Sequence, residues 1–240
     1  LGTWSLWIMA GLLVVSALAE VLSNDRPLVA LYEGRWSFPV LDNPPETAYG
    51  GDFATPTDWK DPYLAEQFAK PGNWKVGTLN PHSATSTDYF QKAPNPAPPS
   101  AKNWLGTDGL GRDVAAGLIH GIRVSLTIGL VVVAIQASIG VLLGGIAGYY
   151  GGPADLVLSR IFEVMLGIPT FFLIITVAAV FKPSIYLIMV ILGLTGWVGI
   201  ARLIRSEFLR VRAMDYVAAA QSLGARDTRI MLRHILPNAI

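Results

Sequence analysis

Residues 124–154, VSLTIGLVVVAIQASIGVLLGGIAGYYGGPA, form the longest stretch of the chain that contains no charged side chain and no histidine. An unpaired charge at the centre of a bilayer costs on the order of 3 kcal/mol even on lenient insertion scales, so windows of this kind locate membrane spans. About 20 apolar residues cross the hydrocarbon layer as a helix. The stretch therefore predicts a transmembrane helix over about 124–150.

Three further windows are equally free of charge: residues 4–19, extended past Glu20 to Leu22, residues 164–181 and residues 183–201. Only helices and closed barrels satisfy every backbone group in lipid, and these runs lack the alternation of barrel strands. A signal peptide is the alternative for the first window, but no basic region precedes it. We predict an all-α, polytopic membrane protein with four transmembrane helices, over residues 1–22, about 124–150, 156–181 and 184–204.

Composition agrees with a membrane protein and excludes several functions. Hydrophobic residues make up 52% of the chain and charged residues 15%, whereas soluble domains carry roughly 25% charged residues. The net charge of +1 gives no basic field for nucleic acid. The absence of cysteine excludes disulfides, thiolate metal sites and cysteine nucleophiles, and leaves the redox compartment open.

Residues 23–103 differ from the rest of the chain, because they hold twelve of the sixteen prolines. Two apolar runs, 27–32 and 35–38, flank Glu33-Gly34, where glycine allows the positive φ of a two-residue turn. Residues 95–100, NPAPPS, suggest an extended linker. We predict a soluble insert with a small β-hairpin, followed by a membrane domain over 104–240.

Orientation follows from the arginines after the fourth window, because basic flanks stay cytoplasmic. Counting back through four crossings places the N-terminus in the cytoplasm and the insert outside the membrane, in the periplasm. The arginines are Arg202, Arg205, Arg210, Arg212, Arg226, Arg229 and Arg233.

The tail that carries these arginines contains the segment DYVAAAQSLG, residues 215–224, and then Leu236-Pro237. Asp215 suits a helix N-cap, Gly224 suits the left-handed residue that closes a helix, and Asp227 suits the cap of a second helix. The pattern predicts two short helices joined by a sharp turn, with Pro237 near the start of a third. An amphipathic helical hairpin on the bilayer surface is the alternative.

At these residues the sequence resembles the binding-protein-dependent permeases of ABC importers. Ala218 and His234 stand where that family usually has glutamate and isoleucine, and the matching residues are Ala219, Ala220, Gly224, Leu236 and Pro237. The resemblance implies that residues 205–240 form a cytoplasmic coupling loop, in which a short helix docks in a groove of a separate ATPase subunit.

Two further blocks resemble the C-type permeases of the dipeptide and oligopeptide branch. The first is WLGTDGLGRD, residues 104–113, in which Gly106, Gly111, Asp108, Arg112 and Asp113 suit a tight external turn; Ala116-Gly117 replaces a family Ser-Arg. The second is GYYGGPAD, residues 148–155. The size of the insert makes permeases for microcin C-type peptides the nearest branch.

Residues around the second block have structural interpretations. Gly151 and Gly152 permit a chain reversal, and Pro169 predicts a kink in the third helix. Arg160 and Glu163 lie three apart on one helix face, where they can neutralise each other; proton coupling by Glu163 is the alternative. Small residues predict close helix packing, either internal or with a sister subunit: Gly129, Ala134, Ala137, Ser138, Gly140, Gly144, Gly145 and Gly148.

The resemblance implies a subunit of the bacterial inner membrane that translocates peptides without catalytic residues, cofactor or metal of its own. Its implied partners are a second permease, cytoplasmic ATP-binding subunits that hydrolyse ATP, and a periplasmic peptide-binding protein. The family normally has six helices, so two more are expected after Leu236-Pro237. A secondary transporter or channel working without an ATPase is the alternative; an enzyme is disfavoured, because no phosphate loop or His-Glu-x-x-His pair occurs.

Overall fold

The computed structural model describes residues 2–87, 94–182 and 184–239 of the chain. These residues form two compact units, Leu1–Leu126 and Thr127–Ile240. The helix α4, Val114–Tyr150, begins in the first unit and ends in the second.

The first unit begins with an apolar helix, α1, Gly2–Ala17, and a short one, α2, Ala19–Leu22. The predicted helix over 1–22 is therefore interrupted, at Leu18. α2 is tied to the first turns of α4, because Arg123 pairs with Glu20 at 2.8 Å and a ring nitrogen of His120 lies 2.7 Å from the Ser23 carbonyl oxygen.

The insert contains the predicted hairpin. Strands β1, Val29–Tyr32, and β2, Arg35–Ser37, pair antiparallel, and both turn residues have positive φ, 47° at Glu33 and 78° at Gly34. Such angles match the right-handed twist of the flanking strands. A third strand, β3, Trp74–Val76, pairs with the other edge of β1 and gives the order β2-β1-β3. This strand was not predicted.

One face of this sheet carries the core of the insert. The helix α3, Pro62–Phe68, is capped by Asp61, which accepts from the Tyr63 N–H at 2.9 Å, and a 3₁₀ turn, η1, covers Glu46–Tyr49. Aromatic rings meet edge to face, as at Tyr49 and Trp59 with centroids 4.9 Å apart. The buried residues are Ala30, Tyr32, Tyr49, Trp59, Leu64 and Phe68.

Asp113 links the insert to α4. Its carboxylate accepts from the Ala116 N–H at 2.7 Å, as a helix N-cap does, and from the side-chain amides of Asn80 at 2.9 Å and Asn103 at 3.0 Å. Burial disfavours its charge, but these hydrogen bonds outweigh burial and lower the Asp113 pKa. α4 therefore begins at Val114, not near residue 124, because a cap and not the edge of the apolar window starts it.

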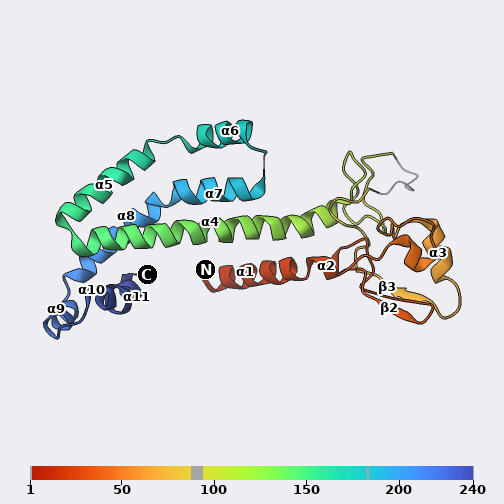
Figure 1. Cartoon of the computed structure of the whole chain (residues 1–240), viewed down its shortest axis with the longest axis horizontal. Coiled ribbons are helices and arrows are strands. Elements are labelled where there is room, and N and C mark those ends of the chain that lie inside the picture. The colour runs from red at the N-terminus through yellow and green to blue at the C-terminus, as the bar shows by residue number, and fades with distance from the viewer. Residues whose placement is uncertain (1, 88–93, 183, 240) are drawn as a thin grey trace. The chain divides into compact units, whose positions relative to one another are not determined.

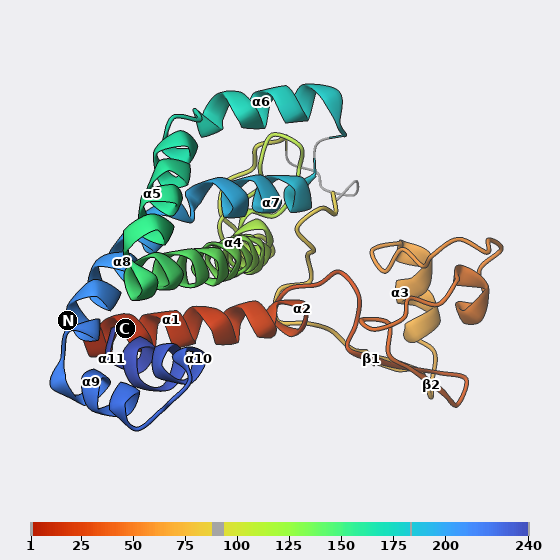
Figure 2. The ribbon, with the colours of Figure 1, turned by 60° about the vertical axis from the view of Figure 1, so that its left-hand side comes forward.

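The second unit departs from the predicted third and fourth helices. α5, Gly152–Leu166, and α6, Thr170–Val180, replace one helix over 156–181 and meet at an angle of 66° (Figures 1 and 2). Pro169 stands at the break, where its ring and missing N–H prevent a continuous helix. α7, Ile185–Gly196, and α8, Val198–Arg212, carry the fourth helix past residue 204, its predicted end, and into the predicted coupling loop.

The all-α class of the membrane domain is confirmed, whereas the count of four spans stays a prediction. Among the described residues, Val114–Tyr150 and Ile185–Arg212 are long and apolar enough to cross a membrane, and the bent pair α5–α6 makes a third if it acts as one span. α1 is apolar but has only 16 residues.

Three of the small residues on α4 form an internal helix contact. An added Cβ would lie 2.8 Å from Ile200 Cβ at Gly140, 2.9 Å from Ala201 Cα at Gly144 and 2.6 Å from Phe208 Cβ at Gly148. Spaced four residues apart, these glycines let α4 and α8 pack backbone to backbone. At Gly129 a Cβ would meet nothing within 4 Å.

The tail folds as short helical pieces after α8. They are α9, Asp215–Ser222, α10, Asp227–Arg229, the π-helical segment η2, Ile230–Ile235, and α11, Leu236–Ala239. Figure 2 shows them gathered at one end of the second unit.

Candidate coupling site

The tail is held to the membrane helices by an apolar cluster. Val217 of α9 and Ile230 and Ile235 of η2 are fully buried, and they pack with residues of α4 and α8. Burial of a Val or Ile side chain contributes on the order of 1.5–3 kcal/mol, so three such anchors fix the tail firmly to the helices. The other buried members are Tyr149, Ile204, Phe208 and Val211.

α9 is closed at Gly224, where two backbone hydrogen bonds cap the C-terminal end of the helix. Its φ of 76° lies in the left-handed region, as predicted. The Gly224 N–H donates to the Gln221 carbonyl at 2.9 Å, and the Ala225 N–H donates to the Ala220 carbonyl at 3.1 Å. This is the Schellman arrangement, which satisfies the last carbonyls of a helix and turns the chain sharply.

The predicted caps at Asp215 and Asp227 are wrong. Met214 occupies the N-cap of α9 and Arg226 that of α10, neither with a capping side chain, and each aspartate is the first residue of its helix. A carboxylate there still meets the positive end of the helix dipole. Asp227 instead accepts from the Tyr149 hydroxyl at 2.7 Å, which ties the second tail helix to the end of α4.

Leu236-Pro237 follows a π-helical segment, which is wider than an α-helix. Pro237 lies in the first turn of α11, close to the predicted helix start, but η2 runs directly into it. Within a continuous helix the proline ring collides with the carbonyl four residues earlier. The π-helical turn of Ile230–Ile235 widens the backbone at that point, and the Asn238 side chain donates to the His234 carbonyl at 2.7 Å.

The outer side of the tail is open and exposes apolar side chains among charged ones. Leu223, next to Gly224, is 88% exposed, and Leu232 and Tyr216 are also exposed. Of the residues that match the family motif, Ala219, Gly224 and Pro237 are exposed together with Asp215, whereas Ala220 and Leu236 are half-buried. A rigid helix with small residues on an open face can seat closely against a partner.

An ion pair that was not predicted from the sequence joins α5 to α8. Arg205 holds Asp155 through two hydrogen bonds, Nε to Oδ1 and Nη2 to Oδ2, the latter 2.6 Å long. Nearby, Arg212 donates to the Tyr149 carbonyl at 2.5 Å, beside Gly151 and Gly152, which both have positive φ and reverse the chain as predicted.

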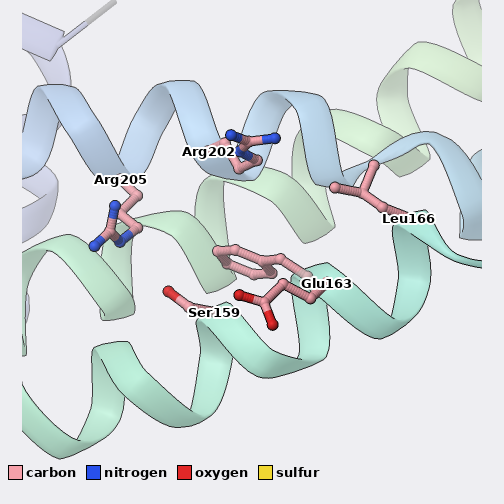
Figure 3. A pocket seen from close by; sticks show the side chains of 6 residues that line it. Ser159, Glu163, Leu166, Arg202 and Arg205 are labelled. Carbon is pink, nitrogen blue, oxygen red and sulfur yellow. The ribbon is translucent and has the colours of Figure 1, made fainter.

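A hollow of about 240 Å³ lies between α5 and α8 and is shown in Figure 3. Arg160, outside this hollow, pairs with Glu163 at 2.6 Å, and both side chains are largely exposed. No group of three potential metal ligands occurs in the described parts of the chain. The lining residues are Ser159, Phe162, Glu163, Leu166, Arg202 and Arg205.

The predicted external turn belongs to the other unit. Gly106 and Gly111 have positive φ of 77° and 75°, and Asp108 pairs with Arg112 at 2.7 Å. Hydrogen bonds from the Arg112 backbone and side chain lower the pKa of Asp108. The pair closes the turn, whereas Asp113 leaves it to cap α4.

The sequence is similar to those of known proteins. Residues 140–240 match the family described as the binding-protein-dependent transport system inner membrane component. Over its full length the chain is 43% identical to the inner membrane ABC transporter permease protein YejE of Escherichia coli, of which it covers 70%, and 36% identical to the peptidoglycan transport system permease protein YejE of Agrobacterium fabrum, of which it covers 68%.

A third relative matches over a shorter region. The dipeptide transport system permease protein DppC of Bacillus subtilis is 40% identical over 68% of this chain and half of its own length. Identity above 40% over the whole chain, together with the match at the tail, identifies the protein as a member of the family of binding-protein-dependent inner membrane permeases of ABC transporters.

Proposed function

We propose that this chain is a permease subunit of an ABC importer that carries peptides across the inner membrane, and that its tail receives the motion of ATPase subunits. The observation that carries the proposal is the form of α9, which is closed by Gly224, anchored through Val217 and open on its outer side. A short helix held this way moves with α4 and α8 when a partner displaces it.

Peptides are proposed as cargo because of the relatives. Two relatives that match over the whole chain are named as an ABC permease and a peptidoglycan transport permease, and DppC is named for dipeptides. Oligopeptides or peptide-like compounds such as microcin C fit the same class. Selection among peptides is assigned to a soluble binding protein, and energy to two ATP-binding subunits, with a second permease completing the path.

The proposed orientation places the tail and the N-terminus in the cytoplasm and the insert in the periplasm. The arginines of α8 and the tail support it, because basic segments beside a span stay inside. In this orientation the exposed side of α9 faces the compartment that holds ATP, and the insert faces the compartment in which a binding protein delivers its cargo.

Orientation can be tested directly because the chain has no cysteine. Single-cysteine variants Ala54→Cys in the insert and Ala219→Cys in α9 place a thiol at an exposed site of each unit. A membrane-impermeant thiol reagent applied to spheroplasts should label the first variant at once and the second only after permeabilisation. Labelling of the second in intact spheroplasts would exclude any contact with a cytoplasmic ATPase.

Transport itself is tested by reconstituting the chain with its second permease and ATPase subunits in liposomes. Peptide uptake should require ATP and the binding protein, and uptake by the chain alone should be absent. The alternative, a secondary transporter or channel, predicts uptake or conductance without an ATPase, which the same liposomes measure.

A further inference from the structure

A cavity of about 250 Å³ in the insert is lined by three cationic side chains, Arg26, Lys60 and Lys75. Trp59 forms part of its wall, and Asp25 is the one carboxylate in its lining. The cavity lies wholly within the first unit. Its charge favours an anion, because like charges that converge on one hollow raise the concentration of counter-ions there.

Lys75 projects from β3 on the side of the sheet that carries the core, although the residue itself is exposed. In the antiparallel pair of β1 and β3, Lys75 lies directly opposite Ala30, so both side chains point to the same face of the sheet. That face is the buried one, as Ala30 and Tyr32 show. An apolar residue is expected at such a position, since side chains alternate between the core and solvent.

The Lys75 ammonium has aromatic neighbours. Its nitrogen lies 5.4 Å from the ring centre of Trp59 and 5.3 Å from that of Phe68, within the range of cation–π attraction. Within the described ranges, neither Lys75 nor Arg26 forms an ion pair. Partial desolvation of its ammonium lowers the pKa of Lys75. Lys75 is an exposed residue, so its ammonium, held beside two aromatic rings without an ion-pair partner among the residues described, is open to an incoming anion.

We propose that this cavity receives the carboxylate of an aspartate or glutamate side chain presented by the soluble protein that delivers peptide to the permease. The assignment rests on the proposed function, because it needs the insert outside the membrane and a delivering partner. Volume favours a single side chain: pockets for drug-sized ligands run from about 300 to 1,000 Å³, more than this cavity offers.

A carboxylate bound there would lie between Lys75 and Arg26, with Trp59 as an apolar wall for its methylene groups. Charge-assisted hydrogen bonds to a planar carboxylate are short and directional, and arginine can make two of them at once. One acidic side chain would thus fix the register of the partner on the insert. Other contacts around the cavity would add buried interface area but would not determine the orientation of the partner.

The first test uses the full chain in lipid nanodiscs, without partners. The acylation rate of Lys75 by an amine reagent is measured by mass spectrometry with and without blocked glutamate, N-acetyl-glutamate N-methylamide. Lys70 is the internal control, because its ammonium donates to Gln67 at 2.6 Å and it does not line the cavity. Blocked glutamate should slow the labelling of Lys75 at least about tenfold at saturation and leave Lys70 unchanged.

Two comparison probes make this test decisive. Blocked glutamine has the same shape without the charge, and inorganic phosphate offers a different anion. Equal protection by glutamine and glutamate, or stronger protection by phosphate, would overturn the assignment. Arg26→Gln should weaken protection by glutamate while Lys75 stays available for labelling; protection that is unchanged in this variant would also overturn it.

The second test measures docking of the cognate peptide-binding protein to the reconstituted complex. Lys75→Gln and Lys75→Met keep the side-chain stem over the aromatic rings and remove the charge, and Lys70→Gln is the matched control. Docking affinity should fall at least about tenfold in both Lys75 variants, with a weaker dependence on salt, and stay unchanged in the control.

Affinities that are equal in all three variants would overturn the proposed occupant. The two proposals can fail separately. Peptide uptake by the unmodified complex tests the proposed function, whereas protection of Lys75 is measured without ATPase, cargo or partner.

Discussion

Arg205 of α8 donates two parallel hydrogen bonds to Asp155 of α5, although the two residues lie 50 positions apart in the chain. The Asp155 side chain is 18% exposed and that of Arg205 33%. Planar two-point contacts of this kind fix orientation as well as distance. The backbone of the same residue lies against Gly148 of α4, where an added Cβ would come within 2.6 Å of the Arg205 carbonyl oxygen, so α4, α5 and α8 meet at Arg205.

Removing the charge of Asp155 should loosen this junction. We expect Asp155→Asn to lower the free energy of unfolding by about 1–3 kcal/mol, because Arg205 would keep its charge in a partly buried place without its partner. Thermal unfolding in detergent micelles measures the loss. A double-mutant cycle with Arg205→Gln should give a coupling energy of at least about 1 kcal/mol.

The pair Arg160 and Glu163 supplies the control for that experiment. It lies on the same helix, but its side chains are 79% and 61% exposed. Exposed pairs contribute about 0–1 kcal/mol, so Glu163→Gln should unfold near the wild-type temperature. Equal losses in both variants would contradict a special role for the junction at Arg205.

Close packing of α4 and α8 depends on Gly144. A Cβ there would overlap the Ala201 backbone, with Ala201 Cα 2.9 Å away. Gly144→Ala should therefore destabilise the second unit by about 1–3 kcal/mol, although alanine favours a helix more than glycine does. Gly129→Ala, at an open position of α4, should be neutral or slightly stabilising. Thermal unfolding in micelles measures the stabilities of the two variants. Equal stabilities would contradict close packing of α4 against α8 at Gly144.

Sequence predicted the parts of the fold that depend on local composition. Apolar windows located α4 and the fourth helix, and Glu33-Gly34 located the hairpin, because hydropathy and turn chemistry are properties of short segments. Helix ends were less predictable. The start of α4 depends on Asp113, whose partners Asn80 and Asn103 precede it by 33 and 10 residues, and β3 has only three residues to signal a strand.

The candidate site divides in the same way. The left-handed conformation of Gly224 follows from local chemistry, and so does the pair of Arg160 with Glu163. Asp227 could not be assigned to the Tyr149 hydroxyl, since that contact joins residues 78 positions apart. A single sequence carries no signal of such long-range contacts. For the same reason the ion pair between Asp155 and Arg205 was not predicted.

The insert should lose stability as pH falls, through His82. Burial, and then the neighbouring ammonium group of Lys60, lower the His82 pKa below its usual value; hydrogen bonding to the Lys102 carbonyl and the charge of Asp113 oppose them, and Lys102 adds to the lowering. The unfolded chain then binds a proton near pH 6.5 that the folded insert resists. Stability is complete above that pH and falls below it, by up to about 1.4 kcal/mol per pH unit.

Hydrogen exchange of the insert at pH 7.5 and pH 5.5 measures this effect. His82→Gln removes the titrating ring and should flatten the dependence, even though it also perturbs contacts with Lys102 and Asn103. His120→Gln serves as a control that removes a histidine from the same unit. A dependence on pH that survives in the His82 variant would assign it to another group.

Coupling to the ATPase should depend on the backbone of Gly224 rather than on its small size. Its φ of 76° suits glycine and asparagine but strains a β-branched residue, at a cost of about 1–3 kcal/mol, while a Cβ there would meet no other atom within 4 Å. Gly224→Val should therefore deform the end of α9 and reduce peptide uptake and peptide-stimulated ATPase activity together. Gly224→Asn adds a side chain but tolerates the left-handed conformation, so it should retain most of both activities. Reconstituted complexes provide the measurement. Normal activity of the valine variant would show that the bend does not transmit motion, and equal loss in both variants would show that the partner requires the empty space and not the turn.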